Sequence, residues 1–309
     1  MTARSTALGA TAALAACIAW SAVAFAQDVH KLTDLQYAEA GGQPLKLDLY
    51  QPSEPHAPLL VWLHGGRWEV GSKERMPLGG LVERGYAVAS LDFRPASRAR
   101  FPAQVHDIKA ALRFLRARAP DYGYDATRIG ILGESSGGHL AALVGTTNGQ
   151  AELEGSLGEH LGVSSEVHAI VSYFGASDLL TILAQSTPYG LGIREPALKT
   201  LLGVLPAENE ALARLASPVF QVDLHDPPLL LLHGDQDPQM PINQSHELEG
   251  AYERAGLDAK LIVVHGAGHG GGAFYDAERT KLVAAFLDEH LRRNLASDVR
   301  NASEAGSRP

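Results

Sequence analysis

Cysteine is almost missing from this chain of 309 residues, in which Cys17 is the single example. The N-terminal segment that contains Cys17 is expected to be removed, so the mature chain would have no cysteine. Disulfide bonds then cannot hold the fold together, and catalysis by a thiolate and cysteine-based zinc sites are excluded. The hydrophobic core must therefore supply the stability.

A basic stripe is also missing. Lysine and arginine number 26 against 35 aspartates and glutamates, which gives a net charge of −9, and charges of both signs are scattered along the chain. We therefore expect no nucleic-acid partner, and the acidic balance indicates solubility only. With 45% hydrophobic and 20% charged residues, the composition is that of a globular protein. The length suits one large core.

The one long apolar run lies at the N-terminus. Arg4 supplies a positive start, an Ala- and Leu-rich stretch follows, and the small-x-small sequence 24–26 precedes polar residues. This pattern predicts a cleaved signal peptide over residues 1–26, and hence export to the periplasm or the medium. As an alternative, the sequence 14–17 resembles a lipobox, which would acylate Cys17. A membrane anchor is a further alternative, but the stretch is Ala-rich and barely long enough, so no stable span is expected.

Beyond the signal, short apolar runs alternate with amphipathic segments. Strands are predicted at 45–50, 58–63, 87–93, 128–132, 169–174, 228–232 and 260–264. Helices are predicted at 75–84, 102–119, from about 137, at 242–255 and at 276–291. Strands that alternate with helices predict an α/β fold, with a mostly parallel central sheet flanked by helices on both faces.

One folded domain over residues 27–295 accounts for this pattern, and two segments depart from it. Residues 179–217 are rich in Leu and Ala with scattered Gly and Pro, which predicts a small helical cap inserted into the domain. Its charged side chains, Arg194 and Lys199 among them, suggest a solvated cap over a compact pocket. Residues 296–309 are small and polar, which predicts a disordered tail.

The sequence Gly133-Glu134-Ser135-Ser136-Gly137 is a G-x-S-x-G motif between a predicted strand and a predicted helix. In this context the motif presents a nucleophilic serine on a tight turn, where the glycines avoid steric clashes. The start of the helix offers free N–H groups that favour an anion. Only Ser135 has glycine two residues before and after it, so it is the predicted nucleophile. A Gly/Ser loop that binds phosphate or caps a helix is the alternative.

Three neighbours of the serine receive other roles. The backbone N–H of Ser136 can donate to an oxyanion. Glu134 occupies the variable position of the motif, and His139 lies one turn into the predicted helix. For these two residues we favour structural or local hydrogen-bonding roles over catalytic ones.

The sequence HGGRW at 64–68 directly follows an apolar predicted strand. An H-G-G segment at this place supplies backbone N–H groups that face the serine. Such donors stabilise a tetrahedral intermediate by about 3 kcal/mol each. We assign the donors to Gly66 and Arg67, with Gly65 as a further candidate. His64 is expected to lock the loop rather than to act as a base. An ordinary glycine turn is the alternative.

A serine nucleophile needs a base, and the base needs an orienting carboxylate. In enzymes whose nucleophilic serine lies on a strand-to-helix turn of an α/β sheet, the catalytic residues follow the chain order serine, acid, histidine. Asp237 is the predicted acid, because Asp235 lies closer to the end of its strand and is better placed to brace the turn. His269 is the predicted base, since its glycine-rich loop can bend toward Ser135. His265 is the runner-up.

Together these segments resemble the α/β-hydrolase superfamily, and more narrowly the hormone-sensitive-lipase-like and BD-FAE-like carboxylesterases, over about residues 45–291. The resemblance rests on HGGRW, GESSGGHLAAL, PPLLLLHGDQDP and GAGHG. It implies the α/β-hydrolase fold, a triad of Ser135, Asp237 and His269, and an oxyanion hole built by the H-G-G loop. Many esterases of the broader group have a third glycine where this chain has Arg67. The H-G-G-x-W form also occurs in kynurenine formamidases.

The residues and the resemblance together predict a serine carboxylic ester hydrolase that forms an acyl-enzyme and needs no cofactor or metal. The expected substrates are short-acyl esters or small aromatic or carbohydrate-linked esters, and no oligomeric state is predicted. A formamidase or peptidase with the same triad stays open, as does a secreted binding protein on a hydrolase scaffold. The last alternative would require a missing triad or oxyanion residue, and none is missing.

Overall fold

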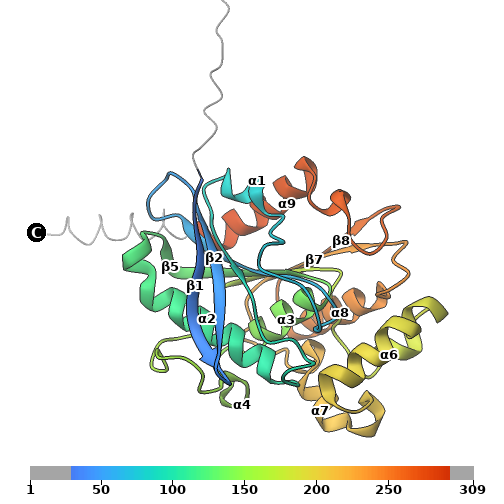
Figure 1. Ribbon diagram of the computed structural model, residues 1–309. Helices are drawn as coiled ribbons and strands as arrows, with labels where there is room; N and C mark the ends of the chain where they lie inside the picture. The colour runs from blue at the N-terminus through green and yellow to red at the C-terminus, as the bar shows by residue number, and fades with distance from the viewer. Residues whose placement is uncertain (1–28, 293–309) are drawn as a thin grey trace, which may run out of the picture.

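Eight strands form one sheet in the computed structural model, which describes residues 29–292 (Figure 1). The strands are β1 (His30–Ala40), β2 (Gln43–Gln51), β3 (Pro58–Leu63), β4 (Ala87–Leu91), β5 (Asp125–Glu134), β6 (Ala169–Tyr173), β7 (Leu229–Gly234) and β8 (Ala259–Val264). Their order is β1-β2-β4-β3-β5-β6-β7-β8. The β1–β2 and β2–β4 pairs are antiparallel and the other pairs are parallel. The predicted mostly parallel α/β sheet is confirmed.

Helices cover both faces of this sheet (Figure 1). The α-helices are α1 (Gly79–Val82), α2 (Ala103–Tyr122), α3 (Ser136–Gly145), α4 (Ala151–Glu154), α5 (Ile182–Gln185), α6 (Pro188–Leu202), α7 (Glu210–Leu215), α8 (Asn243–Ala255) and α9 (Ala277–Leu287). Short 3-10 helices lie at Pro206–Glu208, Pro218–Phe220 and Gly272–Phe274, and a π-helical turn at Asp288–Arg292. The buried clusters place α2, α3 and α8 on one face and α1 and α9 on the other.

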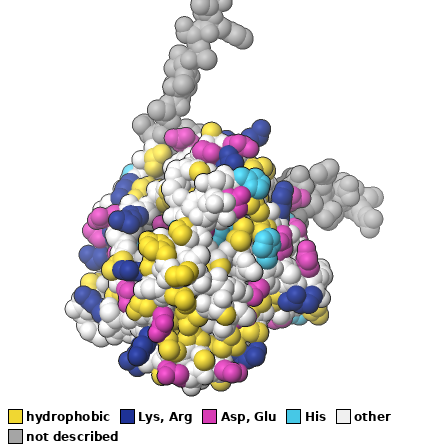
Figure 2. All heavy atoms as spheres, turned by 90° about the vertical axis from the view of Figure 1, so that its right-hand side faces the viewer, with side chains coloured by type: hydrophobic (Ala, Val, Ile, Leu, Met, Phe, Trp, Pro, Cys, Tyr) yellow, Lys and Arg dark blue, Asp and Glu magenta, His cyan; other side chains and the backbone are white. Residues whose placement is uncertain are grey.

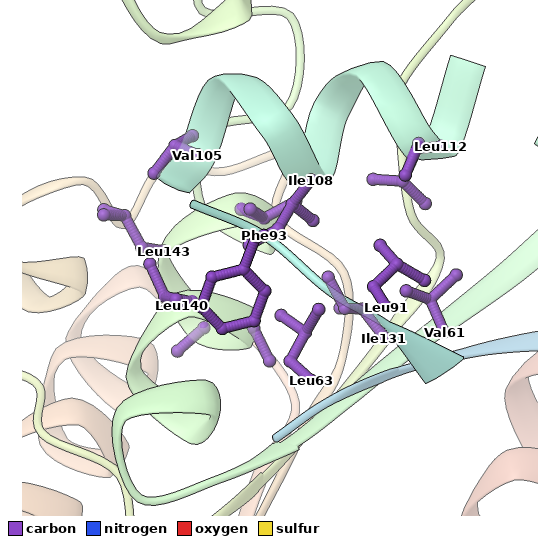
Figure 3. Packing of buried hydrophobic residues seen from close by; sticks show 14 of the residues in the cluster. Val61, Leu63, Leu91, Phe93, Val105, Ile108, Leu112, Ile131, Leu140 and Leu143 are labelled. Atoms are coloured by element: carbon purple, nitrogen blue, oxygen red, sulfur yellow. The ribbon is translucent and has the colours of Figure 1, made fainter. Parts of the chain in front are cut away.

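The side chains of β3 alternate between the two core layers. Val61 and Leu63 join the cluster that contains α2 and α3, and Leu60 and Trp62 join the one that contains α1 and α9. Both faces are covered, which explains why the strand is a continuous apolar run. Figure 3 shows the first cluster, with Leu91, Phe93, Val105, Ile108, Leu112, Ile131, Leu140 and Leu143 also labelled. Each such buried aliphatic side chain contributes about 1.5–3 kcal/mol, so this packing fixes β5 and α3, between which the serine lies.

β1 is a strand that the sequence pattern does not predict. Many of its side chains are exposed, and its burial does not alternate along its length. It forms a hairpin with β2 through Gly41 and Gly42, whose φ values are 59° and 74°. A Gly-Gly pair between two strand-forming segments is the hairpin signal that the sequence does contain.

The helix predicted at 75–84 is wrong over most of its length, because only the four residues of α1 are α-helical there. Pro77 has no N–H to give to a helix, and Gly79 and Gly80 have low helix propensity. The other predicted strands and helices are present, with ends shifted by a few residues.

Between β6 and β7 the chain leaves the sheet for a segment that contains α5, α6 and α7. α6 packs on the loop after β7, where a Cβ added to Gly190 would lie 3.0 Å from the Pro238 carbonyl oxygen. The Phe101 N–H donates to the Leu201 carbonyl at 2.9 Å, which ties the same helix to the loop before α2. This segment therefore lies at the carboxyl edge of the sheet.

Some predictions fall outside the described part of the chain. The signal peptide at 1–26, with Cys17, and the tail at 296–309 lie beyond residues 29–292. Within those described residues no helix combines the length and the apolar character needed to cross a bilayer. In the same range no three His, Cys, Asp or Glu side chains converge into a group that could hold a metal ion.

Candidate active site

The turn between β5 and α3 holds Ser135 in a strained backbone conformation, with φ 52° and ψ −118°. A conformation of this kind in a residue other than glycine costs on the order of 1–3 kcal/mol. The Ser135 N–H donates to the Tyr173 carbonyl at 2.9 Å and holds the turn. A Cβ on Gly133 would lie 2.3 Å from the Gly137 carbonyl oxygen, and one on Gly137 would lie 2.2 Å from that of Leu63. Only glycine fits at both positions.

Two hydrogen bonds join Ser135, His269 and Asp237. The Ser135 Oγ–His269 Nε2 distance is 2.9 Å, and the His269 Nδ1–Asp237 Oδ2 distance is 2.6 Å. An ionised carboxylate can only accept, so Nδ1 carries the ring proton and Nε2 is free to accept the serine proton. The Phe174 ring packs edge-on against the imidazole, with 4.9 Å between centroids. The structure thus brings together the three residues predicted as the triad.

The Asp237 carboxylate is buried and fully engaged. Its Oδ1 accepts hydrogen bonds from the N–H groups of Gln239 and Met240, both at 2.8 Å. His233, wholly buried beneath it, places Nε2 3.5 Å from Oδ2. Burial raises the pKa of Asp237, but the interactions with His233 and His269 outweigh that effect and hold the pKa well below its usual range. The carboxylate therefore stays ionised and orients the imidazole.

The runner-up residues form a pair of their own. The His265 Nδ1–Asp235 Oδ2 distance is 2.8 Å, and the Gly266 N–H donates to Asp235 Oδ1 at 2.7 Å. The His265 side chain is 84% exposed. This pair braces the loops after β7 and β8 at the surface, and within residues 29–292 neither residue forms a hydrogen bond with Ser135. The bracing role expected for Asp235 matches this geometry.

The H-G-G loop lies directly against the serine turn. A Cβ on Gly65 would be 3.3 Å from the Ser135 Cβ, and one on Gly66 would be 2.0 Å from the Val70 carbonyl oxygen. Gly66 has φ 125°, which glycine tolerates best. Its carbonyl accepts from the N–H groups of Glu69 and Val70, both at 3.0 Å, so the loop closes on itself.

The predicted oxyanion donors keep their N–H groups available. Over residues 29–292, the backbone N–H groups of Gly65, Gly66, Arg67 and Ser136 donate to no backbone carbonyl. The Ser136 hydroxyl is also buried without a partner in that range. A substrate oxygen above the serine could therefore recruit these groups without breaking an existing backbone bond.

His139 anchors the end of the same loop. Arg67 and Trp68 are two successive non-glycine residues with positive φ, 59° and 61°. The buried Trp68 Nε1–H donates to His139 Nδ1 at 3.1 Å, and His139 Nε2–H donates to the Ala216 carbonyl at 2.7 Å. Burial lowers the pKa of His139 to about 4, so the ring is neutral and its tautomer is fixed. This is the local hydrogen-bonding role that the sequence favours for His139.

Glu134 and His64 also take no part in the two hydrogen bonds that join Ser135, His269 and Asp237. Glu134 accepts a hydrogen bond from the Tyr275 hydroxyl at 2.6 Å, which ties the serine turn to the segment before α9. The His64 ring stacks on Phe93 with 4.5 Å between centroids, and its Nδ1 lies 2.8 Å from the Gly65 carbonyl oxygen. Burial lowers the pKa of His64, so the ring stays neutral. Both placements fit the structural roles expected from the sequence.

Arg194 is one of the charged side chains from which a solvated cap is predicted, and its placement differs from that prediction. The side chain is fully buried, and its Nη2 donates to the Gln239 carbonyl at 3.3 Å. The sequence gives no signal for this, because α6 mixes polar and apolar residues and only its packing on the loop after β7 decides which face is covered. His233 is likewise unpredicted beside Asp237, although it stands four residues before it, near the end of β7.

Comparison with known proteins gives the family. The family model described as BD-FAE matches residues 47–252, and a second one, described as a TAP-like protein, matches residues 213–293. The chain belongs to the BD-FAE family of α/β-hydrolases. In this BD-FAE family member, Ser135 and Asp237 lie within the first match and His269 lies within the second.

Several proteins resemble the BD-FAE chain over most of its length. Esterase LipC of Mycobacterium tuberculosis is 30% identical over 80% of this chain and 62% of its own. A solved truncated carbohydrate esterase from gut microbiota is 34% identical, with a TM-score of 0.75, over 84% of this chain and 95% of its own. The propionate-bound esterase Est2 of Thermogutta terrifontis is 26% identical, with a TM-score of 0.67, over 85% and 94%. The chain covers 62%, 53% and 49% of three curated relatives, which are therefore longer proteins.

Proposed function

We propose that this protein is a serine carboxylic ester hydrolase that works through an acyl-enzyme. The observation that carries the proposal is the pair of hydrogen bonds that links Ser135 to His269 and His269 to Asp237. A serine hydroxyl is a poor nucleophile alone, and a histidine held in the correct tautomer by a carboxylate activates it. The names of the relatives, which include esterases and a carbohydrate esterase, support the same class of reaction.

In this mechanism the Ser135 Oγ attacks the acyl carbon while His269 Nε2 takes the hydroxyl proton. Asp237 holds the imidazole and stabilises the imidazolium that forms. His269 then gives the proton to the departing alkoxide, which leaves the acyl group on Ser135. A water molecule, deprotonated by His269, attacks this acyl-enzyme and releases the carboxylic acid and the free serine.

The oxyanion of the tetrahedral intermediate would accept hydrogen bonds from Gly66 and Arg67 in the H-G-G loop and from Ser136 at the start of α3, with Gly65 as a further donor. Removing one donor of this kind typically lowers kcat by about 10²–10³. The side chain of Arg67 does not interfere with this role, because the N–H is the donor.

The substrates we propose are short-acyl esters or small aromatic or carbohydrate-linked esters. Arg67 and Trp68 follow Gly65, which lies against Ser135, and would narrow the acyl side. Each methylene that fits adds about 0.8 kcal/mol of burial, so kcat/KM should rise with acyl length and fall where the pocket ends. A series of p-nitrophenyl esters from acetyl to palmitoyl tests this, and a rise that continues to dodecanoyl would contradict it.

The function itself is tested by labelling and by a substrate panel. A fluorophosphonate should add one adduct, on Ser135, and Ser135→Ala should lose both the adduct and the esterase activity while keeping its circular dichroism spectrum. An adduct on Ser136 would contradict the assignment. Acetyl-xylan, methyl ferulate and N-formylkynurenine belong on the panel, because preference for the last would make the protein a formamidase. Activity should be unchanged by EDTA, as the mechanism uses no metal.

We also infer that the protein is exported. The basic start at Arg4, the apolar run and the small-x-small sequence at 24–26 support cleavage of residues 1–26. N-terminal sequencing of the protein from a periplasmic or culture fraction should begin near Gln27. Metabolic labelling with palmitate that depends on Cys17 would instead show a lipoprotein.

A further inference from the structure

Arg194 is a fully buried cation on α6, next to the proposed triad. Its Nη2 donates to the Gln239 carbonyl at 3.3 Å. The N–H of Gln239 donates in turn to the Asp237 carboxylate at 2.8 Å. A single residue thus separates the guanidinium from the acid of the triad.

Most of this guanidinium has no partner. The Nε and Nη1 atoms of Arg194 are buried and form no hydrogen bond within residues 29–292, and the bond made by Nη2 is long. A buried donor without an acceptor costs about 1–3 kcal/mol, and more when the group is charged. Native proteins retain such donors where a ligand, an ion or water satisfies them. The side chain is therefore set up to receive an acceptor.

The charges around Arg194 favour an anion as that acceptor. Burial lowers the pKa of Arg194 to about 10, Asp237 raises it and Arg67 lowers it, so the guanidinium is protonated at neutral pH. Within residues 29–292 the Asp237 carboxylate forms no hydrogen bond with Arg194 and instead accepts from Gln239, Met240 and His269. Arg67 adds a second positive charge, and within residues 29–292 its side chain makes one long ion pair, 3.9 Å from Nε to Glu69 Oε2.

We propose that Arg194 recognises a carboxylate carried by the ester substrate, and that the positive charge of Arg67 adds to the attraction. The inference rests on the proposed ester hydrolysis and narrows its substrates to esters that bear an acidic group. Guanidinium–carboxylate hydrogen bonds are charge-assisted and about twice as strong as neutral ones. Such a carboxylate occupies the free N–H groups of Arg194 and offsets the repulsion between the two arginines.

The outer surface does not provide this selectivity. Figure 2 shows the side of the molecule that carries α6, where acidic and basic side chains are interspersed around a band of hydrophobic ones. Tyr189, at the start of α6, is one large apolar side chain exposed to solvent. A mixed surface of this kind does not attract anions in general, so a preference for an acidic substrate must arise inside the site.

The test compares esters that differ only in a carboxylate or a carboxamide. Monoethyl succinate and ethyl succinamate place the group on the acyl side, and 4-acetoxybenzoate and 4-acetoxybenzamide place it on the alcohol side. We expect the acid-to-amide ratio of kcat/KM to reach about tenfold or more in one pair, since charge-assisted bonds replace neutral ones. The pair that shows the preference tells on which side of the ester the carboxylate lies.

Variants then assign the preference. Arg194→Gln should lower the acid-to-amide ratio about tenfold, mainly through KM of the acid, and Arg194→Lys should keep part of the ratio. Arg67→Gln should lower it less. Lys199→Gln is the matched control, because it removes the same charge from the exposed side of the same helix and should leave the ratio unchanged.

Two results would overturn the inference. One is an acid-to-amide ratio near or below one in both pairs for the unmodified protein, and the other is an equal loss for acid and amide in Arg194→Gln, as a purely structural cation would give. Should Arg194→Gln fail to fold, Arg67→Gln and Arg194→Lys carry the same comparison of ratios. Absence of turnover for all four esters, with no fluorophosphonate adduct on Ser135, would instead refute the proposed function.

Discussion

Two aspartate–histidine pairs are built from the same two loops, after β7 and β8, and differ chiefly in burial. Asp237 and His269 lie 2.6 Å apart, with side chains 1% and 12% exposed. Asp235 and His265 lie 2.8 Å apart, with side chains 31% and 84% exposed. An exposed ion pair contributes about 0–1 kcal/mol and constrains little. The same two residue types, a few positions further along each loop, are buried in the Asp237–His269 pair. There the imidazole is held in one orientation and forms a hydrogen bond with Ser135.

Removing the imidazole should separate the two pairs most strongly. We expect His269→Ala to lower kcat by roughly 10⁶, the scale seen when a triad histidine is lost. His265→Ala should stay within about threefold of the unmodified protein, because an exposed pair carries little energy. Steady-state hydrolysis of p-nitrophenyl acetate measures both. A large loss in well-folded His265→Ala would show that the surface pair is also used in catalysis.

The carboxylates give the next largest contrast. Asp237→Asn should lower kcat by about 10⁴, because an amide favours the wrong histidine tautomer and leaves the imidazolium unsupported. Asp235→Asn keeps the shape of the loop brace and should have a minor effect. The same kinetic assay, with thermal melting as a folding control, tests the pair. Losses of equal size in two folded variants would show that Asp237 and Asp235 do not differ in their importance for turnover.

A smaller effect on kcat is expected from loss of the buried hydrogen bond between Trp68 and His139, which acts only on the H-G-G loop. Trp68→Phe keeps an aromatic side chain, although a smaller one, and removes the donor to His139. We expect kcat to fall by roughly ten- to a hundredfold, less than for losing an oxyanion donor outright, with KM changed less. Trp62→Phe is the matched control, because it deletes a similar bond, to the Arg75 carbonyl at 2.7 Å, elsewhere in the core. An equal fall in kcat for both variants would make the effect one of general packing.

His139 extends the comparison to a histidine with no carboxylate partner. Its folded-state pKa is about 4 against 6.5 for the free side chain. As the pH falls, the unfolded chain therefore binds a proton on His139 before the folded chain does. The resulting contribution of His139 to the free energy of unfolding is fully present above pH 6.5 and is lost as the pH falls toward 4. The loss amounts to about 3 kcal/mol. Urea unfolding at several pH values should show this slope, and His139→Gln should flatten it. An unchanged slope would place the sensitivity elsewhere.

Much of the site is predictable because its signals are local. Gly133 and Gly137, two residues before and after Ser135, are required by the backbone of one turn, and both glycines are visible in the sequence itself. The order of Asp237 and His269 follows from two loops that each come after an apolar strand. Choosing Asp237 over Asp235 needs only their distance from the end of β7.

What the sequence does not reveal depends on contacts between distant segments. The sequence of α6 does not indicate that Arg194 is buried, because the burial comes from packing on a loop 45 residues later in the chain. The hydrogen bond from Trp68 to His139 spans 71 residues. β1 is a strand by virtue of its pairing with β2, and the helix expected at 75–84 fails locally, at Pro77 and the glycines after it.

The bonds of His139 also make two parts of the molecule depend on each other. One ring nitrogen of His139 accepts a hydrogen bond from Trp68, at the end of the H-G-G loop. The other donates to the carbonyl of Ala216, which follows α7 in the segment between β6 and β7. Displacing that segment would free the imidazole and let the strained residues Arg67 and Trp68 relax. The segment and the loop are thus thermodynamically coupled, and such coupling is reciprocal. In the proposed acyl-enzyme, an acyl group that stabilised the loop would, by the same free energy, also hold the segment in place until the product leaves.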